Sequence, residues 1–280
     1  MKESKKHISR EIGLEIGHIV GKGLFQLDHL HYGLWKKGIE PCILNLHIAQ
    51  DEYCKFIISH IPAEVKTILD VGCGTGAFSK KLVDIGYKVD CVSPTPYQNK
   101  LVEELLGDTS EIFKCKFEDI QTNKKYDMIQ FCESFQYIDL DRVVDIAGGL
   151  LNDGGYMLIC DFFKTQSQDK CGLKGGHKFE KFKTIMQASP FKIIEDIDIT
   201  AETAPNMDIV DKAAKEVVIP IADAVDRFLQ SRHPLLTKLA KWKYRKKIEK
   251  AQQKYLYGKR TGKDFAEAKT YRLFVCRKVK

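Results

Sequence analysis

A glycine cluster in the first third of the chain is the first feature that could do chemistry. In the stretch TILDVGCGTGAFSKKL (residues 67–82), Gly72, Gly74 and Gly76 alternate with other residues after a short apolar run. Glycine lets the backbone approach a ligand closely, and the N–H groups at the start of a following helix can bind that ligand. The stretch therefore predicts a cofactor-binding loop between a buried strand and a helix.

The residues around this loop separate two adenosine cofactors. With Ala77 as its third small residue, the loop matches the dinucleotide pattern G-x-G-x-x-G/A, in which an acid about 20 residues later binds the ribose. Here the next predicted strand ends in Ser93, and its acid, Asp90, lies at a different position. Asp70, just before the glycines, would repel a pyrophosphate but suits a cation. The pattern favours S-adenosylmethionine, which carries a sulfonium and an ammonium group and no phosphate.

Imidazoles and aromatic rings come together in FQLDHLHYGLW, residues 25–35. His29 and His31 are candidate bases, and Tyr32 and Trp35 could place their π faces near a sulfonium. The alternative is an aromatic helix cap that packs on the sheet.

An acid follows an apolar run in FCESFQYI. The ionised form of Glu133 needs a partner there, and it could stabilise a developing cation or accept a proton, with Tyr137 donating to it or to a substrate. A helix N-cap is the alternative. A third stretch, CGLKGGHKF (residues 171–179), has the glycines of a mobile lid and a further possible base, His177. Cys171 lies in the same stretch, but no third group completes a thiol catalytic set.

Alternating strands and helices must position these groups. Helices between short apolar strands indicate a parallel sheet covered on both faces, and such sheets bind ligands at the carboxyl ends of their strands. We expect an α/β fold: a Rossmann-like, mostly parallel seven-stranded sheet with helices on both faces. Strands are predicted at 67–71, 88–92, 112–117, 126–132, 156–162, 191–200 and 268–278, and helices at 43–59, 76–85, 96–106 and 141–151.

Four segments follow from this pattern. Residues 1–60 are expected to form a helical cap over the cofactor site, and residues 61–200 the Rossmann-like cofactor-binding core. Residues 201–266 are expected to form a basic helical insertion that caps the sheet edge, and residues 267–280 the final strand of the core.

Several of these motifs together resemble a known family, over most of residues 24–200. ILDVGCGTGAFSKKL looks like the first motif of class I S-adenosylmethionine-dependent methyltransferases. VDCVSPTPYQ resembles the second-strand motif of the branch that contains cyclopropane synthases and sterol and tocopherol methyltransferases. YDMIQFCESFQYI is similar to the fourth motif, LLNDGGYMLICDFF to the strand that follows, and the aromatic stretch at 25–35 to an N-terminal HYGYW motif. In this branch an acid at the place of Glu133 faces the methyl-transfer centre.

The resemblance implies roles for individual residues. The glycine loop passes its backbone close to the methionyl part of the cofactor, and Asp70 orients the loop or the ammonium group. In the stretch that corresponds to the family's adenine-binding motif, this chain has Lys116 at a place where an acid is common. The implied cofactor-binding set is Asp70, Gly72, Cys73, Gly74, Gly76, Ser93 and Gln98 for the methionyl and ribose parts, Phe117 and Glu118 for the adenine, and Trp35 as a closing aromatic. The implied catalytic set is Glu133, Tyr137, His31 and Tyr32.

The positive charge belongs to one segment. The chain carries +7, whereas residues 238–260 contain ten Lys or Arg and one acid, so the remaining chain carries −2. A helical stripe there, Leu236, Ala240, Tyr244, Ile248, Ala251 and Tyr255, predicts packing on the parent domain. An anionic membrane surface is the second interpretation and nucleic acid the third. Nucleic acid is disfavoured because FCESF occupies the place of the N-P-P-Y/F tetrapeptide of DNA and RNA amino methyltransferases.

The nine cysteines indicate the cellular compartment of the protein. They are odd in number and none has C-x-x-C spacing, which indicates reduced thiols in a cytoplasmic protein and neither a disulfide framework nor a metal site. We therefore expect a methyltransferase for a small, apolar or isoprenoid-like acceptor, with carbon as a candidate atom for methylation. An amine, quinol or sugar acceptor is the near alternative. The sequence does not indicate the oligomeric state.

Overall fold

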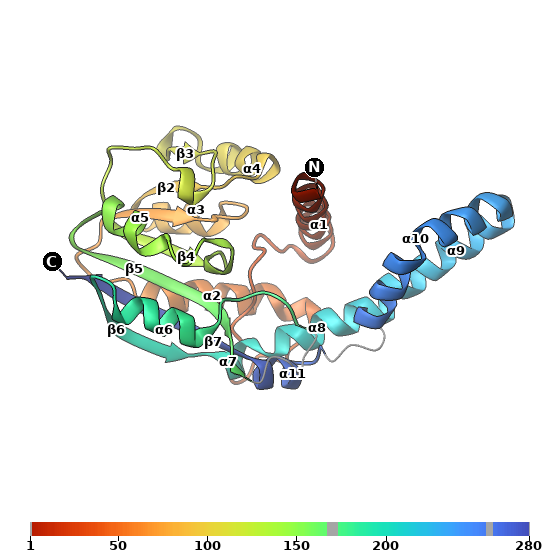
Figure 1. Ribbon diagram of the computed structural model, residues 1–280. Coiled ribbons are helices and arrows are strands. Elements are labelled where there is room, and N and C mark those ends of the chain that lie inside the picture. Colours follow the sequence, from red (N-terminus) through yellow and green to blue (C-terminus); the bar gives the residue numbers. More distant parts are fainter. Residues whose placement is uncertain (1, 167–172, 256–259, 280) are drawn as a thin grey trace.

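The computed structural model describes the backbone of residues 2–166, 173–255 and 260–279, and the side chains of residues 11–166, 173–250 and 260–279. A seven-stranded sheet forms its centre, in the order β3-β2-β1-β4-β5-β7-β6 (Figure 1). The strands are β1 (Thr67–Val71), β2 (Lys88–Val92), β3 (Ile112–Phe113), β4 (Tyr126–Cys132), β5 (Leu151–Lys164), β6 (Phe191–Asp198) and β7 (Lys269–Lys278).

The sheet confirms the predicted fold class. The pairs β1–β2, β1–β4, β2–β3 and β4–β5 are parallel, whereas β7 runs antiparallel between β5 and β6. Two predicted strands differ in length from the observed ones by more than two residues. The strand expected at 112–117 ends at Phe113, and a 3-10 helix, η3 (Phe117–Asp119), follows it. The strand expected at 156–162 extends over 151–164, where Leu151 pairs with Tyr126 of β4 and β7 pairs with β5 as far as Lys164.

Helices cover both faces of the sheet and create two cores. One face of the sheet is covered by α2 (Leu46–Ser59), α3 (Ala77–Asp84) and α4 (Pro96–Leu106). Their buried side chains in this core include Tyr53, Leu82 and Val102. On the other face, Ala147 of α5 (Val143–Leu150) and Phe182 of α6 (Phe179–Gln187) pack against the sheet. The central strands are mostly apolar because both of their faces are covered. Short turns of 3-10 helix complete the layers at η1 (Ile43–Asn45), η2 (Gly107–Thr109) and η4 (Phe135–Tyr137).

A long helix and an irregular segment precede these layers. Figure 1 shows α1 (Lys2–Phe25) standing apart from the layered body. Residues 26–42, here called the strap, then lead to α2. The hydroxyl of Thr75 in the glycine loop donates a hydrogen bond to Asp28 O at 2.6 Å, so the strap lies against the cofactor loop.

The insertion before β7 divides into two parts. Its helices are α7 (Thr200–Thr203), α8 (Pro205–Ala213), α9 (Ile219–Arg232), α10 (Pro234–Tyr255) and α11 (Gly262–Ala268), with a π-helical turn at Ala214–Val218. Buried Ile209 of α8 and Phe265 of α11 pack on the body, as expected for a cap.

The prediction that the basic helical stripe packs on the parent domain is wrong for helices α9 and α10. They project from the body as a pair, here called the hairpin (Figure 1). Lys241 of α10 and Asp226 of α9 form an ion pair at 2.6 Å between the two helices. Leu236 and Tyr244 of the predicted stripe are exposed, whereas Ala251 and Tyr255 lie outside the described side chains. Among the described residues, no helix is long and apolar enough to span a bilayer.

Candidate active site

The three glycines of the cofactor loop adopt left-handed backbone conformations. The φ angles of Gly72, Gly74 and Gly76 are 76°, 59° and 82°. A Cβ atom on Gly72 would collide with Ser134 of the loop after β4, whereas one on Gly74 would meet no atom within 4 Å. Gly72 therefore allows two loops to pack closely, and Gly74 leaves its backbone open to a ligand at the start of α3.

Asp70 lies beneath this loop. It is 3% exposed, and its Oδ2 accepts a hydrogen bond from Ser79 Oγ of α3 at 2.5 Å. Burial raises the pKa of the Asp70 carboxyl. Asp70 thus joins the end of β1 to the first turns of α3 on either side of the glycine loop. The Cys73 side chain is buried in the core, so Cys73 presents its backbone to the cofactor side.

Polar residues after β2 form the predicted ribose region. Ser93 Oγ donates to Gln98 Oε1 at 3.1 Å and accepts from the Thr95 backbone N–H at 3.2 Å. Ser93 is fully buried, whereas Gln98 is half-buried. The Ser93 bond to the Gln98 oxygen leaves the Gln98 amide N–H groups to donate to a ligand.

The predicted adenine residues occupy two different environments. Phe117 is buried, and its ring meets the Phe131 ring edge-on at 5.2 Å between centroids. Glu118 is half-buried, and its Oε1 accepts a hydrogen bond from the Asp139 backbone at 2.7 Å. Phe117 therefore supports the wall of this region from the core, while Glu118 joins the segments that follow β3 and β4.

These residues fit S-adenosylmethionine. The open backbone at Gly74 and the amide of Gln98 lie after two neighbouring parallel strands, at the sheet edge where such folds bind ligands. Ser93 stands where a dinucleotide site has its ribose acid, and the Asp70 carboxylate lies under the loop that would otherwise carry a pyrophosphate.

Glu133 has an unusual backbone conformation directly after β4. Its φ of 58° is left-handed, a costly state for a residue with a side chain. Glu133 Oε1 accepts hydrogen bonds from the Tyr32 backbone N–H at 2.7 Å and from the Tyr271 hydroxyl at 2.8 Å. Burial raises the pKa of the Glu133 carboxyl to about 8, although both hydrogen bonds act in the opposite direction.

Aromatic rings surround the two donors of Glu133. The Tyr32 ring centroid lies 6.4 Å from that of Phe162, 6.3 Å from that of Phe265 and 6.2 Å from that of Tyr271. The Tyr32 hydroxyl donates to the sulfur of Met207 at 3.3 Å. Glu133 therefore places a carboxyl beside an apolar wall, here called the aromatic wall, made of Tyr32, Phe162, Met207, Phe265 and Tyr271.

A second buried carboxyl lies on β5. Asp161 is 1% exposed and accepts backbone hydrogen bonds from Gln136 at 2.9 Å and from Phe162 at 2.8 Å. Burial raises the pKa of Asp161 to about 7, and the charge of Asp161 contributes to the raised pKa of Glu133. The two carboxyls therefore oppose each other's ionisation.

The glycines predicted to form a lid lie over this second carboxyl. Gly175 O accepts a hydrogen bond from Lys269 Nζ at 2.6 Å, and Gly176 N–H donates to the Gln136 side chain at 3.4 Å. His177 Nε2 is bound to the Phe135 carbonyl at 3.0 Å, so this imidazole is engaged by backbone. Cys171 lies outside the described residues.

Three further predicted site residues have environments of different kinds. Trp35 packs in a cluster with Ala49 of α2 and Ile209 of α8, and none of the glycine-loop residues belongs to that cluster. Both ring nitrogens of His31 are engaged, Nδ1 by the Tyr32 carbonyl at 2.8 Å and Nε2 by the Cys54 sulfur at 3.6 Å. His31 therefore offers no free base to the Glu133 site. Tyr137 is 57% exposed.

Burial also changes the protonation of the imidazoles in the strap. It lowers the pKa of His29 to about 4 and that of His31 to about 3, so both rings are neutral at pH 7. Burial raises the pKa of the Cys54 thiol to about 12. The Cys54 sulfur lies 3.7 Å from His29 Nε2, and this contact of two strap residues with α2 was not predicted.

Sequence reasoning missed Tyr271, Asp161 and Lys269. Each lies within an apolar strand pattern that predicts burial and indicates no chemistry. The only available signal was the acid within the run MLICDFF, because a buried acid needs a partner.

Comparisons with known proteins identify the family of this chain. Residues 46–191 match the family described as a methyltransferase domain. Ubiquinone biosynthesis O-methyltransferase from Homo sapiens is 26% identical over 187 residues, which cover 59% of this chain and 50% of the relative. The chain thus spans half the length of that relative.

Solved structures show the same fold across the chain. The cyclase SpnF has a TM-score of 0.65 at 16% identity, with 96% of both chains covered. Geranyl diphosphate C-methyltransferase from Streptomyces coelicolor has a TM-score of 0.63 at 16% identity, with 92% of both chains covered. The family match covers more than half of the chain and contains the glycine loop and Glu133. This chain belongs to the class I S-adenosylmethionine-dependent methyltransferases.

Proposed function

We propose that this protein transfers a methyl group from S-adenosylmethionine to a small, apolar or isoprenoid-like acceptor, and that Glu133 acts in the transfer. One observation carries the proposal: a carboxyl with a strained backbone is held by two hydrogen bonds beside the aromatic wall. Strain of this kind persists where the surrounding structure fixes it, and it is common at active sites.

S-adenosylmethionine, when bound, supplies an activated methyl group on a sulfonium. The protein must align the acceptor with that methyl group and exclude water. The electron pair of the acceptor forms the new bond to the methyl carbon while the carbon–sulfur bond breaks. Glu133 accepts the proton that the acceptor loses or, before that loss, stabilises positive charge on the carbon next to the methylated one.

The composition of the aromatic wall favours an apolar acceptor. Its rings offer apolar surface and π faces, and beside Glu133 its polar groups are mainly two tyrosine hydroxyls that already have partners. The names of two similar proteins point to isoprenoid compounds, ubiquinone biosynthesis in one and geranyl diphosphate in the other. An amine, quinol or sugar acceptor is the alternative, with Glu133 as the base for an N–H or O–H group.

The substitution Glu133→Gln tests the role of the carboxyl. Glutamine keeps an oxygen for the Tyr32 and Tyr271 donors but cannot accept a proton. Turnover should fall about 100-fold or more, as for loss of a general base, while calorimetry shows unchanged affinity for S-adenosylmethionine. Equal losses of turnover and affinity would give Glu133 a structural role. The matched control is Glu195→Gln, a half-buried glutamate of β6 outside the aromatic wall.

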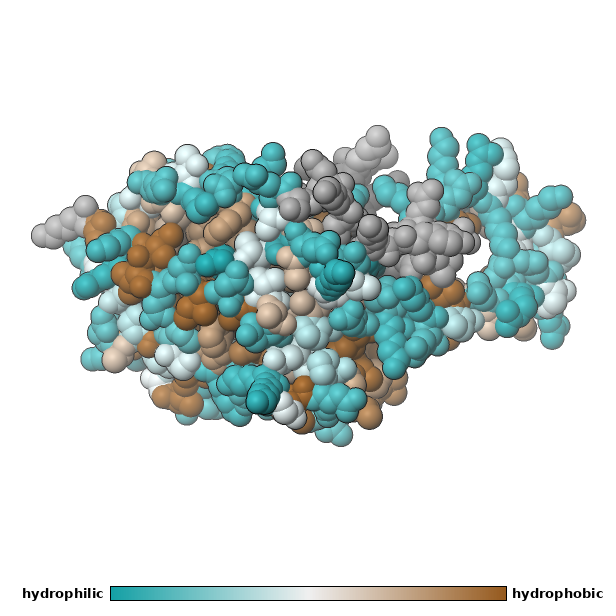
Figure 2. All heavy atoms as spheres, turned by 90° about the horizontal axis from the view of Figure 1, so that it is seen from below, coloured by the Kyte–Doolittle hydropathy of each residue, from teal (hydrophilic) through white to brown (hydrophobic). Residues whose placement is uncertain are grey.

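We propose further that the hairpin binds the surface of an anionic membrane, where an isoprenoid-like acceptor would be found. Leu235, Leu239 and Trp242 of α10 are exposed, and Trp242 is 67% exposed. Lys238 and Lys241 lie between them, and Lys243, Arg245, Lys246 and Lys247 follow along the helix. Figure 2 shows hydrophilic and hydrophobic residues mixed at the projecting end of the molecule. A basic helix with exposed apolar residues suits an anionic interface.

Vesicle sedimentation tests this surface. The protein should sediment with vesicles of phosphatidylcholine and phosphatidylserine but not with phosphatidylcholine alone. The double substitution Lys246→Glu and Lys247→Glu should abolish sedimentation, whereas Lys66→Glu with Lys88→Glu, at exposed sites on the body, should not. Equal binding to both vesicle types, or binding to RNA in preference to vesicles, would overturn the proposal.

A further inference from the structure

Three potential metal ligands meet where the strap crosses α2. They are the imidazoles of His29 and His31 and the thiol of Cys54, and their ligating atoms all lie within 4.8 Å of one another. His29 and Cys54 are buried, and His31 is half-buried. None of the three takes part in the proposed methyl transfer.

The distances suit a single ion. The Cys54 sulfur lies 3.7 Å from His29 Nε2 and 3.6 Å from His31 Nε2. In a tetrahedral zinc site with Zn–N near 2.1 Å and Zn–S near 2.3 Å, a nitrogen and a sulfur ligand lie about 3.6 Å apart. The two rings have centroids 4.6 Å apart and are tilted by 37°.

Neighbouring groups orient the ligands. The Tyr32 carbonyl can only accept a hydrogen bond, so His31 Nδ1 carries the proton of that 2.8 Å contact and Nε2 presents its lone pair to Cys54. A ligating histidine usually donates its other N–H to a carbonyl or carboxylate in this way. Gln50, one helical turn before Cys54, donates to the carbonyls of His29 at 3.2 Å and His31 at 2.7 Å.

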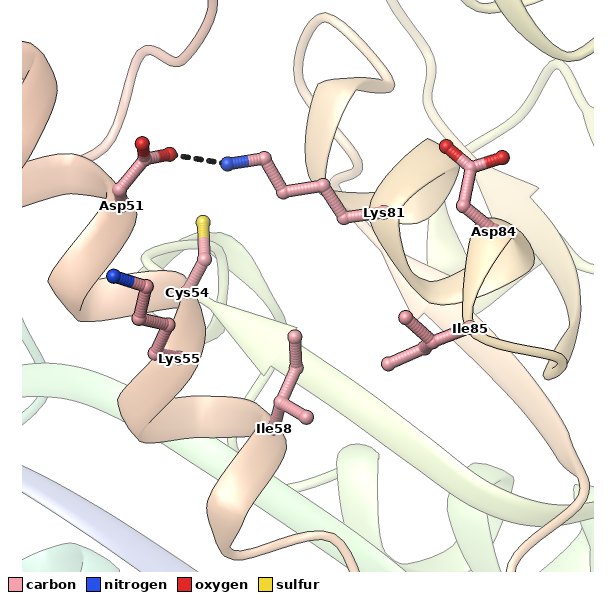
Figure 3. Close-up of a pocket in the computed structure, with 7 residues that line it drawn as sticks. All are labelled: Asp51, Cys54, Lys55, Ile58, Lys81, Asp84 and Ile85. Carbon is pink, nitrogen blue, oxygen red and sulfur yellow. Dashed lines mark hydrogen bonds and ion pairs between the residues drawn. The ribbon is translucent and has the colours of Figure 1, made fainter.

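Space for a fourth ligand lies on the other side of the cysteine. Figure 3 shows the Cys54 side chain projecting from α2 into a pocket, with Asp51 and Lys81 paired beside it. The pocket has a volume of about 300 Å³ and also contains Ile58 of α2 and Asp84 of α3. Cys54 lines this pocket, so the pocket lies next to the sulfur side of the cluster.

We propose that His29, His31 and Cys54 bind one zinc ion, with water or a small anion from the pocket as the fourth ligand. Two imidazoles and one thiolate form a donor set typical of zinc, and the thiol proton is released to solvent when the ion binds. The ion would fix the strap to α2 at two points on either side of Leu30. The next residue after His31 is Tyr32, whose backbone N–H holds Glu133, so the metal would position the strap at the active site.

Cobalt substitution tests the site without reference to activity. The full-length protein is treated with a chelator under reducing conditions, and Co²⁺ is then added. The wild-type chain should give the near-ultraviolet charge-transfer band of a cobalt–thiolate bond and the visible bands of tetrahedral Co²⁺, saturating at one equivalent. Zn²⁺ should displace the cobalt and remove both features.

Variants identify the ligands. Cys54→Ser should remove the charge-transfer band, and His29→Gln and His31→Gln should each weaken cobalt binding at least about tenfold, the loss expected even for an outer-shell partner. The controls Cys115→Ser and His47→Gln change a half-buried thiol and an exposed imidazole outside the cluster and should leave the spectrum unchanged. A wild-type chain without the charge-transfer band, or a band that survives in Cys54→Ser, would overturn the proposal. The wild-type spectrum tests the proposal even if a variant fails to fold.

Discussion

The Tyr271 hydroxyl donates a hydrogen bond to Glu133 Oε1 over 2.8 Å, from a residue 138 positions later in the chain. Tyr271 also contacts the Tyr53 hydroxyl of α2 at 3.2 Å, so its ring connects the last strand, the helical layer and the carboxyl. This bond favours the ionised carboxylate, whereas burial opposes it. The balance between the two sets the pH at which Glu133 can accept a proton.

The substitution Tyr271→Phe should reduce turnover about tenfold or more, because a hydrogen bond to a charged group contributes roughly 1.5–3 kcal/mol. Loss of this donor should also raise the pKa of Glu133, so the pH profile should move to higher pH. Steady-state rates between pH 6 and 10 measure both effects. The control Tyr156→Phe, in which the hydroxyl contacts Glu64 at the surface, should behave like the wild type. An unchanged profile for Tyr271→Phe would show that this bond does not tune Glu133.

The rate should depend on pH through Glu133. As a base it must be ionised, and burial raises its pKa to about 8. For an acceptor that loses a proton, kcat/KM should therefore rise as the pH passes through about 8 and then level off, reporting the free enzyme. The Glu133→Gln variant should lack this rise. A wild-type profile that is flat between pH 7 and 9 would exclude Glu133 as the base.

Two glycines of the cofactor loop should respond differently to substitution. Gly74→Arg should abolish binding of S-adenosylmethionine while the fold survives, because its Cβ meets no atom of the protein. The left-handed φ at this position still costs about 1 kcal/mol or more. Gly72→Ala should unfold at a clearly lower temperature, because its Cβ collides with Ser134. Calorimetric titration and thermal unfolding distinguish the two, and unchanged cofactor binding in Gly74→Arg would contradict the loop assignment.

The stability of the protein should also depend on pH, and the Glu133 carboxyl determines whether stability rises or falls with pH. The pKa of Glu133 is raised in the folded state to about 8 from 4.5, so the fold disfavours its ionised form. The contribution of Glu133 to the free energy of unfolding is fully present below its unfolded pKa of 4.5. This contribution is lost as the pH rises to the folded pKa of about 8. Glu133→Gln should therefore stabilise the protein more at pH 9 than at pH 5. Urea unfolding at both pH values gives the comparison, and an equal shift at both would place the carboxyl in a solvated environment.

Local patterns predicted the central fold but not all of its geometry. The strands β1, β2 and β4 and helix α4 have the predicted bounds, because continuous apolar runs and a proline at the start of a helix are local signals. Strand β3 is shorter because only two of its residues pair with β2. The hairpin has a helical pattern, but that pattern does not show whether its apolar residues meet the body.

The candidate site was predictable where one segment carries the chemistry. The glycine loop and Glu133 both follow apolar strands, and the strand ends of a parallel sheet meet at one edge. Tyr271 became a partner of Glu133 because β7 lies between β5 and β6, a pairing that no local pattern encodes. The contact of His29 and His31 with Cys54 likewise depends on how the strap crosses α2.

The position of β7 also has a consequence during synthesis on the ribosome. Strands β5 and β6 have no direct pairing in the described sheet, because β7 occupies the place between them. A nascent chain that has emerged only as far as the hairpin therefore holds β5 with an open edge and Glu133 without its tyrosine. Such an edge invites pairing with other chains, which makes this stage the one at which a chaperone would be needed.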